Sequence, residues 1–306
     1  MGNLIVAVLG SLGYSGNLGK KGTSTDITLY DLKGGEDIVT LVEATKYPER
    51  LPPLFFATSM AERAIVVVDD ITAAFGESVM MIQSSDIKNG YIVLRNFLTK
   101  EKIEPLTKGT RLENFEYIED NPLILRERLL SDASERKPAV TSVDSSGTVS
   151  VDHFFNAKGV GTVVLGVVKD GVIRKHEAVR VLPGDKTAQI RSIQKHDDEF
   201  EQAAEGDRVG IALKNIDVEY LDRGYVLTTD TSIKSIRAMK TKADLVKYWQ
   251  SPLKAGVVLH VGHWMQFISA RVESVENEGE WQRPVLELSL EKELVYLQGD
   301  RAVATY

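Results

Sequence analysis

Residues 151–168 constrain the fold of this chain more than any other stretch of its sequence. The aromatic pair Phe154 and Phe155 leads into a bend at Gly159 and Gly161, and a nearly unbroken β-branched run follows. Such runs between glycine turns predict strands, and a strand that curls into a barrel needs bends or bulges at which a Cβ would clash. The stretch therefore predicts a small antiparallel β-barrel.

Turn signals further along divide this region into short strands. Residues 169–171 read Lys-Asp-Gly and predict a turn that returns into a second strand, and 182–185 and 205–207 predict two more turns. These turns separate the strands expected at 188–193 and 208–213. This close spacing is typical of a small barrel.

The length and composition predict a globular protein of several domains. A chain of 306 residues is too long for one ordinary core and suggests two or three domains. No apolar run approaches the roughly twenty residues that span a bilayer, so no membrane contact is expected. Because the chain has no cysteine, disulfides and cysteine-ligated metals are excluded, and a cytoplasmic location is the default expectation.

Residues 4–9 predict a buried strand that runs into a glycine-rich loop. Proteins of the α/β class hold phosphates at such loops, because glycine lets backbone N–H groups converge on an anion. The phosphate-loop pattern G-x-x-x-x-G-K-[ST] fits in neither register. Anchored on Gly10, its lysine falls on Gly16, and anchored on Lys20, its first glycine falls on Tyr14.

Periodicity and turn residues predict the other elements. The polar run 131–138 ends in proline and is the expected boundary after the first domain. Helices are expected at 54–62 and 122–130, and strands at 37–42, 64–69, 90–99, 236–239, 257–261, 265–275, 285–290 and 302–306.

Residues 151–227 resemble the second domain of translation factor GTPases of the elongation factor Tu and SelB class. Four motifs carry the resemblance in order: Phe-x-x-x-Gly-x-Gly-Thr-Val-Val, Gly-Val-Ile-Arg-Lys, Gly-Asp-Arg-Val-Gly-Ile-Ala-Leu and Leu-Asp-Arg-Gly-Tyr-Val-Leu. The resemblance implies the fold class α/β plus β. It implies a P-loop GTPase-like parallel sheet domain over 1–133, then two small antiparallel β-barrels over 134–232 and 233–306, the second short of its final strands.

The residues that carry the GTPase reaction in this family are replaced here. At the position of the family's Asp-x-Pro-Gly-His, Glu43 replaces the metal-side aspartate, Lys46 the glycine and Tyr47 the histidine that orients water. In the guanine motif Asn-Lys-x-Asp, Asn96 remains, but Phe97 replaces the lysine and a threonine replaces the aspartate. The resemblance therefore implies a GTPase fold with GTP binding weakened or lost, hydrolysis lost and no catalytic residue.

Residual nucleotide binding stays open, because backbone donors do not depend on side-chain identity. Mg²⁺ is expected only where a nucleotide binds. The two lysines of the loop can equally be solvated residues at a loop end. The candidate GTP-binding residues are Gly10, Gly13, Ser15, Gly16, Lys20, Lys21, Thr23 and Asn96. No histidine has a partner at metal-ligand spacing, so no metal site is expected.

A basic stretch within an acidic chain is the candidate contact for RNA. The net charge is -7, yet Asp244 is the only acidic residue between positions 234 and 254. In the family, this stretch lies where the factors meet the acceptor and T arms of tRNA, and Lys or Arg contacts to phosphate would position the RNA. The alternative is an ordinary solvated edge strand. The candidates are Lys234, Arg237, Lys240, Lys242 and Lys247.

The chain resembles the archaeal SelB-like paralogues most closely, a branch that residues 18–28 suggest and that includes the set proposed to serve pyrrolysine delivery. The expected partners of a monomer are aminoacyl-tRNA and the ribosome, and by analogy the aminoacyl end lies near His153, Phe155 and Asn156, between the first two domains. Two other functions stay open. One is an active GTPase with an unorthodox phosphate loop that uses Lys20, Thr23 and magnesium, and the other is a nucleotide-independent adaptor protein.

Overall fold

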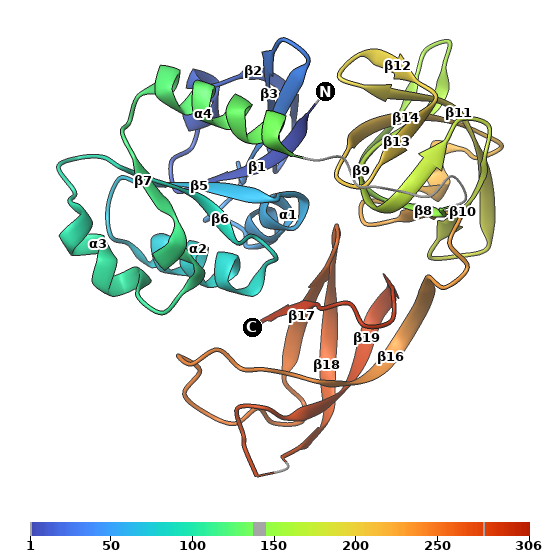
Figure 1. Cartoon of the computed structure of the whole chain (residues 1–306). Coiled ribbons are helices and arrows are strands. Elements are labelled where there is room, and N and C mark those ends of the chain that lie inside the picture. Colours follow the sequence, from blue (N-terminus) through green and yellow to red (C-terminus); the bar gives the residue numbers. More distant parts are fainter. Residues whose placement is uncertain (1, 137–144, 278) are drawn as a thin grey trace.

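Three domains, each organised around its own sheet, pack together in the structure (Figure 1). The structure is a computed structural model that describes residues 2–136, 145–277 and 279–306. The boundary predicted at 131–138 lies partly outside these residues, and within them helix α4 (Pro122–Glu135) continues to Glu135. No helix in the described ranges is long and apolar enough to cross a membrane.

The first domain is built on a seven-stranded mixed sheet. Its strands are β1 (Asn3–Leu9), β2 (Lys20–Ser24), β3 (Thr28–Gly34), β4 (Asp37–Glu43), β5 (Arg63–Val68), β6 (Asn89–Leu94) and β7 (Glu116–Ile118). Their order is β2-β3-β4-β1-β5-β6-β7. Strands β4, β1, β5, β6 and β7 run parallel to one another, whereas β3 is antiparallel to both β2 and β4. The expectation of a parallel sheet is therefore wrong at this edge. Only Gly35 and Glu36 join β3 to β4, and so short a connection can join only antiparallel strands.

Helices cover both faces of this sheet. Helices α1 (Pro52–Met60) and α2 (Ala73–Ser84) bury Leu54 and Val79 in one apolar cluster, and α4 buries Leu125 and Leu129 in another. Alternate residues of β1 belong to the two clusters, so the helices lie on opposite faces. The predicted helices α1 and α4 are confirmed, whereas α2 and α3 (Lys100–Thr107) were not expected.

The second domain is a closed six-stranded antiparallel barrel, as residues 151–168 predicted. The order is β10-β15-β8-β9-β14-β11, and pairing of β10 with β11 closes the ring. Two short strands, β12 (Asp198–Phe200) and β13 (Gln202–Ala204), extend it. The barrel strands are β8 (Gly147–Ala157), β9 (Gly161–Arg174), β10 (Ala178–Leu182), β11 (Lys186–Lys195), β14 (Arg208–Lys214) and β15 (Val226–Thr228).

The glycines of this barrel work differently from the prediction. Strand β9 runs without a turn through residues 169–171, where Gly171 pairs with Gly147, so the expected Lys-Asp-Gly turn is wrong. Gly159 and Gly161 join β8 to β9 with φ angles of 79° and 94°. A Cβ added at either position would meet no atom within 4 Å. The positive φ, and not a steric clash, therefore favours glycine there.

The third domain is one five-stranded antiparallel sheet. Its strands are β16 (Lys234–Lys242), β17 (Val258–His263), β18 (Gln266–Glu276), β19 (Val285–Tyr296) and β20 (Val303–Thr305). In the order β16-β19-β18-β17-β20, the two edge strands do not pair with each other over the described residues. The sheet is therefore open, where a second barrel was expected. The predicted final strand is confirmed as β20.

Helix α1 is the place at which the three domains meet. The rings of Phe55 and Phe56 lie 5.5 and 6.3 Å from that of Phe267 in the third domain. Val167 of the second domain and Met265 of the third belong to the same apolar cluster as α1. The core of the first domain thus continues into both of its neighbours.

Candidate functional site

The glycine-rich loop forms a tight turn between β1 and a short 3₁₀ turn, η1 (Tyr14–Asn17). Gly10 has a φ of 99°, and a Cβ there would lie 2.0 Å from the carbonyl oxygen of Val67. Gly13 adopts the left-handed conformation, with φ 80° and ψ 0°. Strand β2 follows η1, and the first α-helix of residues 2–136 begins only at Pro52. The loop therefore has no α-helix N-terminus to direct at an anion.

The carboxylate of Glu43 occupies the backbone donors of this loop. Its Oε1 atom accepts the N–H of Ser15 at 2.6 Å, and its Oε2 atom accepts the N–H of Gly13 at 3.0 Å. The Tyr30 hydroxyl lies 3.5 Å from Oε2, and Glu43 is only 2% exposed. Two of the three predicted backbone donors, Gly13 and Ser15 but not Gly16, are thus bonded to an acidic side chain of the same domain.

Of the other predicted phosphate-side residues, Gly16 directly follows Ser15 in η1, whereas those on β2 lie apart from the two donors. The N–H of Gly16 donates to the carbonyl of Gly13 at 3.1 Å. Lys20 and Lys21 are exposed on β2, the edge strand, and half-buried Thr23 follows them on the same strand. Strands β3 and β4 separate them from β1 in the sheet.

Arg95 ties together the loops at which the family's guanine site would lie. Its guanidinium contacts Asp69 at 3.0 Å, Asp120 at 3.1 Å and the hydroxyl of Ser11 at 3.3 Å. The predicted residue Asn96 donates from its side-chain amide to the carbonyl of Asp69 at 3.1 Å. Arg95 and Asn96 are therefore both engaged in contacts between the domain's own loops.

Two of the residues that stand in place of the family's GTPase residues make contacts within the first domain. Tyr47 is buried, and its hydroxyl lies 2.8 Å from Glu77 and 2.9 Å from the carbonyl of Ala74 in α2. Burial and the bond to Glu77 raise the pKa of this phenol. Lys46 is exposed and pairs with Glu49 at 3.8 Å. Tyr47 thus holds α2 rather than facing the glycine-rich loop.

The seam between the first two domains carries a charged network. Buried Asp152 receives two hydrogen bonds from Arg208, at 2.7 and 2.9 Å, and lies 2.5 Å from Nδ1 of His153. The other ring nitrogen of His153 lies 2.9 Å from the Thr25 hydroxyl in the β2–β3 turn. His153 therefore connects a buried carboxylate of the barrel to the first domain. Phe155, also expected here, is 45% exposed.

Arg223 makes a second connection across this seam. Its guanidinium contacts Asp26 at 2.8 Å, donates to the carbonyl of Asp152 at 3.0 Å and lies 5.0 Å from the centre of the Phe56 ring. Burial alone would raise the pKa of Asp26, but the hydrogen bond and charge of Arg223 outweigh it and lower the pKa. The ion pair therefore stabilises the contact between the first and second domains.

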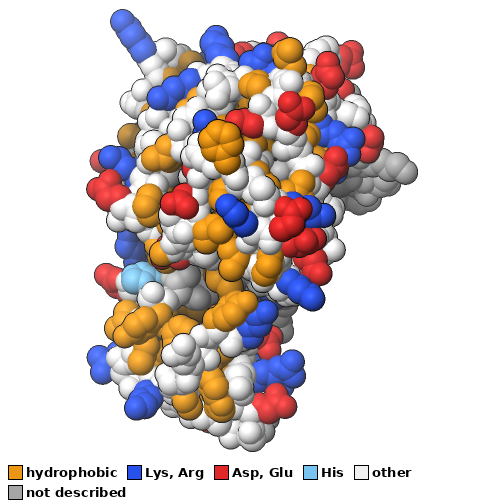
Figure 2. Space-filling view, turned by 90° about the vertical axis from the view of Figure 1, so that its left-hand side faces the viewer, with side chains coloured by type: hydrophobic (Ala, Val, Ile, Leu, Met, Phe, Trp, Pro, Cys, Tyr) orange, Lys and Arg blue, Asp and Glu red, His pale blue; other side chains and the backbone are white. Residues whose placement is uncertain are grey.

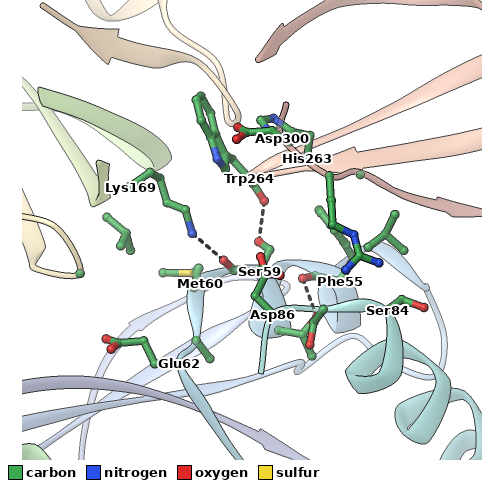
Figure 3. Close-up of a pocket in the computed structure, with 18 of the residues that line it drawn as sticks. Phe55, Ser59, Met60, Glu62, Ser84, Asp86, Lys169, His263, Trp264 and Asp300 are labelled. Atoms are coloured by element: carbon green, nitrogen blue, oxygen red, sulfur yellow. Dashed lines mark hydrogen bonds and ion pairs between the residues drawn. The ribbon is translucent and has the colours of Figure 1, made fainter. Parts of the chain in front are cut away.

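A cavity of about 670 Å³ lies where the three domains meet (Figure 3). Lys169 of the barrel reaches into it and donates to the carbonyl of Ser59 at 2.9 Å, and the hydroxyl of Ser59 donates to the carbonyl of Trp264 at 2.5 Å. Burial lowers the pKa of Lys169, although nearby acids, Asp86 first among them, oppose this effect. Ser59 thus links the second and third domains through the end of α1.

The predicted RNA-contacting residues lie on β16 and in the loop after it. Lys234, Lys242 and Lys247 are exposed. Arg237 and Lys240 are also exposed but pair with acids, at 3.6 Å from Glu293 of the adjacent strand β19 and 2.7 Å from Glu276 of β18, the next strand beyond it. The structure therefore gathers the five residues on one edge strand and its loop, with two of them in ion pairs.

His260 and His263 both contact other side chains of the third domain. His260 is exposed and stacks on Phe267 at 5.3 Å, whereas buried His263 contacts Asp300 at 3.0 Å. In the described part of the chain, no group of three or more His, Asp or Glu residues could hold a metal ion.

Sequence reasoning missed the partners of Glu43, Arg95 and Arg223. Glu43 stood out only as a replacement, because its contacts with the loop join residues that are 28 and 30 positions apart. Arg223 and Asp26 are 197 positions apart. An acid at the end of β4, beside a loop rich in backbone donors, is the one signal that could have found the first contact.

Comparison with known proteins places the chain in a family. The family model described as elongation factor Tu domain 2 matches residues 161–228. An uncharacterized protein of Methanocaldococcus jannaschii is 36% identical over 304 residues, which cover 98% of this chain and 94% of the relative. The selenocysteine-specific elongation factor of the same organism is 24% identical, and the match covers 87% of this chain but 61% of that protein.

Solved structures share the three-domain fold. Translation elongation factor SelB from Methanococcus maripaludis, in its apo form, superposes with a TM-score of 0.80 at 20% identity, over 99% of this chain and 75% of that chain. A bacterial selenocysteine-specific elongation factor gives a TM-score of 0.80 at 18% identity, over 99% of this chain and 56% of its own. The barrel, the order of the domains and these relatives together show that the chain belongs to the SelB-like branch of the elongation factor Tu superfamily.

Proposed function

We propose that this chain is a translation elongation factor that binds aminoacyl-tRNA and the ribosome, with GTP binding weakened or lost and GTP hydrolysis lost. The position of the Glu43 side chain supports the proposed weakening or loss of GTP binding. Its carboxylate accepts the N–H groups of Gly13 and Ser15, which are the donors that a bound phosphate would use.

A phosphate group would have to compete with Glu43 for these donors. Hydrogen bonds between a charged acceptor and a backbone N–H contribute about 1.5–3 kcal/mol each. An incoming phosphate would also lie beside a buried carboxylate of the same charge, which disfavours the ionised forms of both. Since η1 is only one short turn, no helix dipole offsets this repulsion.

The tRNA part of the proposal draws its support from the second and third domains. The barrel matches the family model, and β16 presents exposed lysines at an edge of the third domain. Positive side chains at such an edge would contact phosphates without reading sequence. The seam that contains Asp152 and His153 is where we place the aminoacyl end.

Calorimetric titration and a phosphate-release assay test the nucleotide part of the proposal. GTP, GDP and ATP are each titrated with magnesium into the purified chain by calorimetry, and phosphate release is followed in parallel. We expect no saturable heat at millimolar nucleotide and no release above the rate without protein. Sustained turnover of GTP would overturn the nucleotide part and favour an active GTPase with an unorthodox loop.

A nucleotide-independent adaptor is the second candidate, because two of the five basic residues on the β16 side are paired with Glu276 and Glu293. Filter binding of aminoacyl-tRNA over a salt series separates the two functions. We expect retention at low salt that falls steeply as salt rises. No retention even at low salt would leave the adaptor as the better function.

A further inference from the structure

Phe97 is held in solvent by an unusual backbone. Its side chain is 99% exposed, and its φ is 60°, next to a φ of 52° at Asn96. The turn is closed by the N–H of Leu98, which donates to the carbonyl of Arg95 at 3.0 Å. Asparagine tolerates a positive φ, but a bulky residue such as Phe97 rarely adopts one, and functional sites often keep such strain. The strain and the exposure are separate observations about one aromatic side chain.

The ion pairs of Arg95 bring three other loops beside Phe97. Arg95 contacts Ser11 after β1, Asp69 after β5 and Asp120 after β7. The strands β1, β5, β6 and β7 are neighbours and parallel, so their carboxyl ends meet at one edge of the sheet. The four loops at this edge therefore form one continuous surface.

Three of these loops, and the first turn of α4 after the fourth loop, each expose an apolar side chain at this edge. The exposed fractions are 61% for Leu12, 44% for Ile71, 99% for Phe97 and 68% for Leu123. Scattered apolar residues are normal on a protein surface, as on the face of this molecule in Figure 2, but a contiguous group that is rimmed by polar residues marks an interaction site. We call these four residues the apolar rim.

The charge around the apolar rim indicates the nature of its partner. The four loops contain the acids Asp69, Asp70, Glu119 and Asp120, and Arg95 is their one basic residue. Acidic groups repel nucleic acid but attract a basic protein surface. We infer that the apolar rim docks a protein that presents apolar side chains flanked by lysine and arginine.

A photo-reactive side chain at the centre of the rim tests this inference. The full chain carrying p-benzoylphenylalanine in place of Phe97 is irradiated in a lysate of the native cells, and the cross-linked product is identified by mass spectrometry. The control carries the same group in place of Tyr248, which is 57% exposed on the third domain. We expect the product at position 97 to be one protein, linked through a peptide that contains lysine or arginine.

The identified protein is then purified, and its affinity is measured against three forms of the chain. We expect Phe97→Ser and Asp70→Lys each to weaken binding at least about tenfold, and salt to weaken binding to the unchanged chain. Both replaced side chains are exposed, so the fold should be unaffected. Unchanged binding by both variants would overturn the inference. Cross-linking to RNA, to a second copy of this chain or to nothing beyond the control product would overturn it as well.

The inference does not depend on the proposed function. Retention of tRNA should be the same for the unchanged chain and for Phe97→Ser, because the basic residues of β16 belong to a different domain. A chain that lost tRNA binding together with partner binding in this variant would contradict a separate docking surface.

Discussion

The Oε1 atom of Glu43 lies 2.6 Å from the backbone nitrogen of Ser15. The contact crosses from the end of β4 to the loop that follows β1, its neighbour in the sheet. A side chain of the domain thereby satisfies donors that would otherwise face an anion or water, and burial removes water from the competition. The contact both stabilises the loop and keeps it from another acceptor.

Replacing Glu43 by alanine should therefore have two effects. The free energy of unfolding should fall by about 2–4 kcal/mol, because two backbone N–H groups lose a charged acceptor. The same change removes the carboxylate that opposes a phosphate, so GTP or inorganic phosphate at millimolar concentration should raise the melting temperature of the variant. Differential scanning calorimetry with and without each anion measures both effects.

The control for this experiment is Glu49→Ala, which removes an exposed glutamate from the same domain. It should leave stability within about 0.5 kcal/mol and give no response to phosphate. An equal response of both variants to the anions would show general ion effects instead of an opened loop.

A second prediction concerns the Arg223–Asp26 ion pair across the first two domains. Replacing Arg223 by alanine should lower the free energy of unfolding by about 1.5–3 kcal/mol near pH 6, because the charged hydrogen bond to Asp26 across the seam and the bond to the Asp152 carbonyl within the barrel are lost. The pKa of Asp26 in the folded chain lies below its ordinary value of 3.8. The stability from this pair is therefore complete above the unfolded pKa and is lost as the pH falls through the folded pKa.

Urea unfolding at a series of pH values from about 6 down to about 3 measures this dependence. The difference between the unchanged chain and Arg223→Ala should shrink as the pH falls, since protonation of Asp26 removes the pair from the unchanged chain and the variant already lacks it. Asp185→Asn, an exposed change in the barrel, serves as the control. A difference that stays constant over the whole range would exclude Asp26 as its source.

Local sequence signals predicted the elements but not the contacts between distant residues. The β-branched run after Gly161 and the apolar residues 4–9 lie in strands, because both periodicity and turn glycines act over a few residues. The antiparallel edge of the first sheet was missed because it depends on the short connection at Gly35 and Glu36. The continuous strand through Gly171 was missed because a Lys-Asp-Gly sequence favours a turn unless barrel pairing overrides it.

The candidate site was predictable only in its position. The sequence indicated the loop at 10–23 and the replaced residue Glu43, yet the bond between them depends on two adjacent strands that are distant in the chain. The contacts of Arg95 were not predicted for the same reason, although its neighbour Asn96 was a candidate because of its place in the guanine motif. Arg95 itself contacts three loops that only the folded sheet brings together.

A third prediction concerns the buried ion pair of Asp152 and Arg208. Replacing Asp152 by asparagine should lower the free energy of unfolding by about 3–5 kcal/mol, because Arg208 then remains buried without a charged partner. Combining it with Arg208→Met should recover part of the loss, since no unpaired charge remains. Chemical denaturation of the single and double variants measures the coupling energy between Asp152 and Arg208. A double variant that loses more stability than the two single variants lose in sum would contradict this prediction.

The last prediction concerns the salt dependence of tRNA binding. Lys234 and Lys242 are exposed on β16, so each contact that they make with a phosphate would release counterions. Replacing either by alanine should weaken binding and reduce the slope of log affinity against log salt by about 0.7–0.9. The matched control is Lys102→Ala on α3, an exposed lysine of the first domain that should leave the slope unchanged. Because Lys240 pairs with Glu276 at 2.7 Å, Lys240→Ala should change the slope less than either exposed residue does. Equal slopes for all four proteins and the unchanged chain would place the tRNA on another surface.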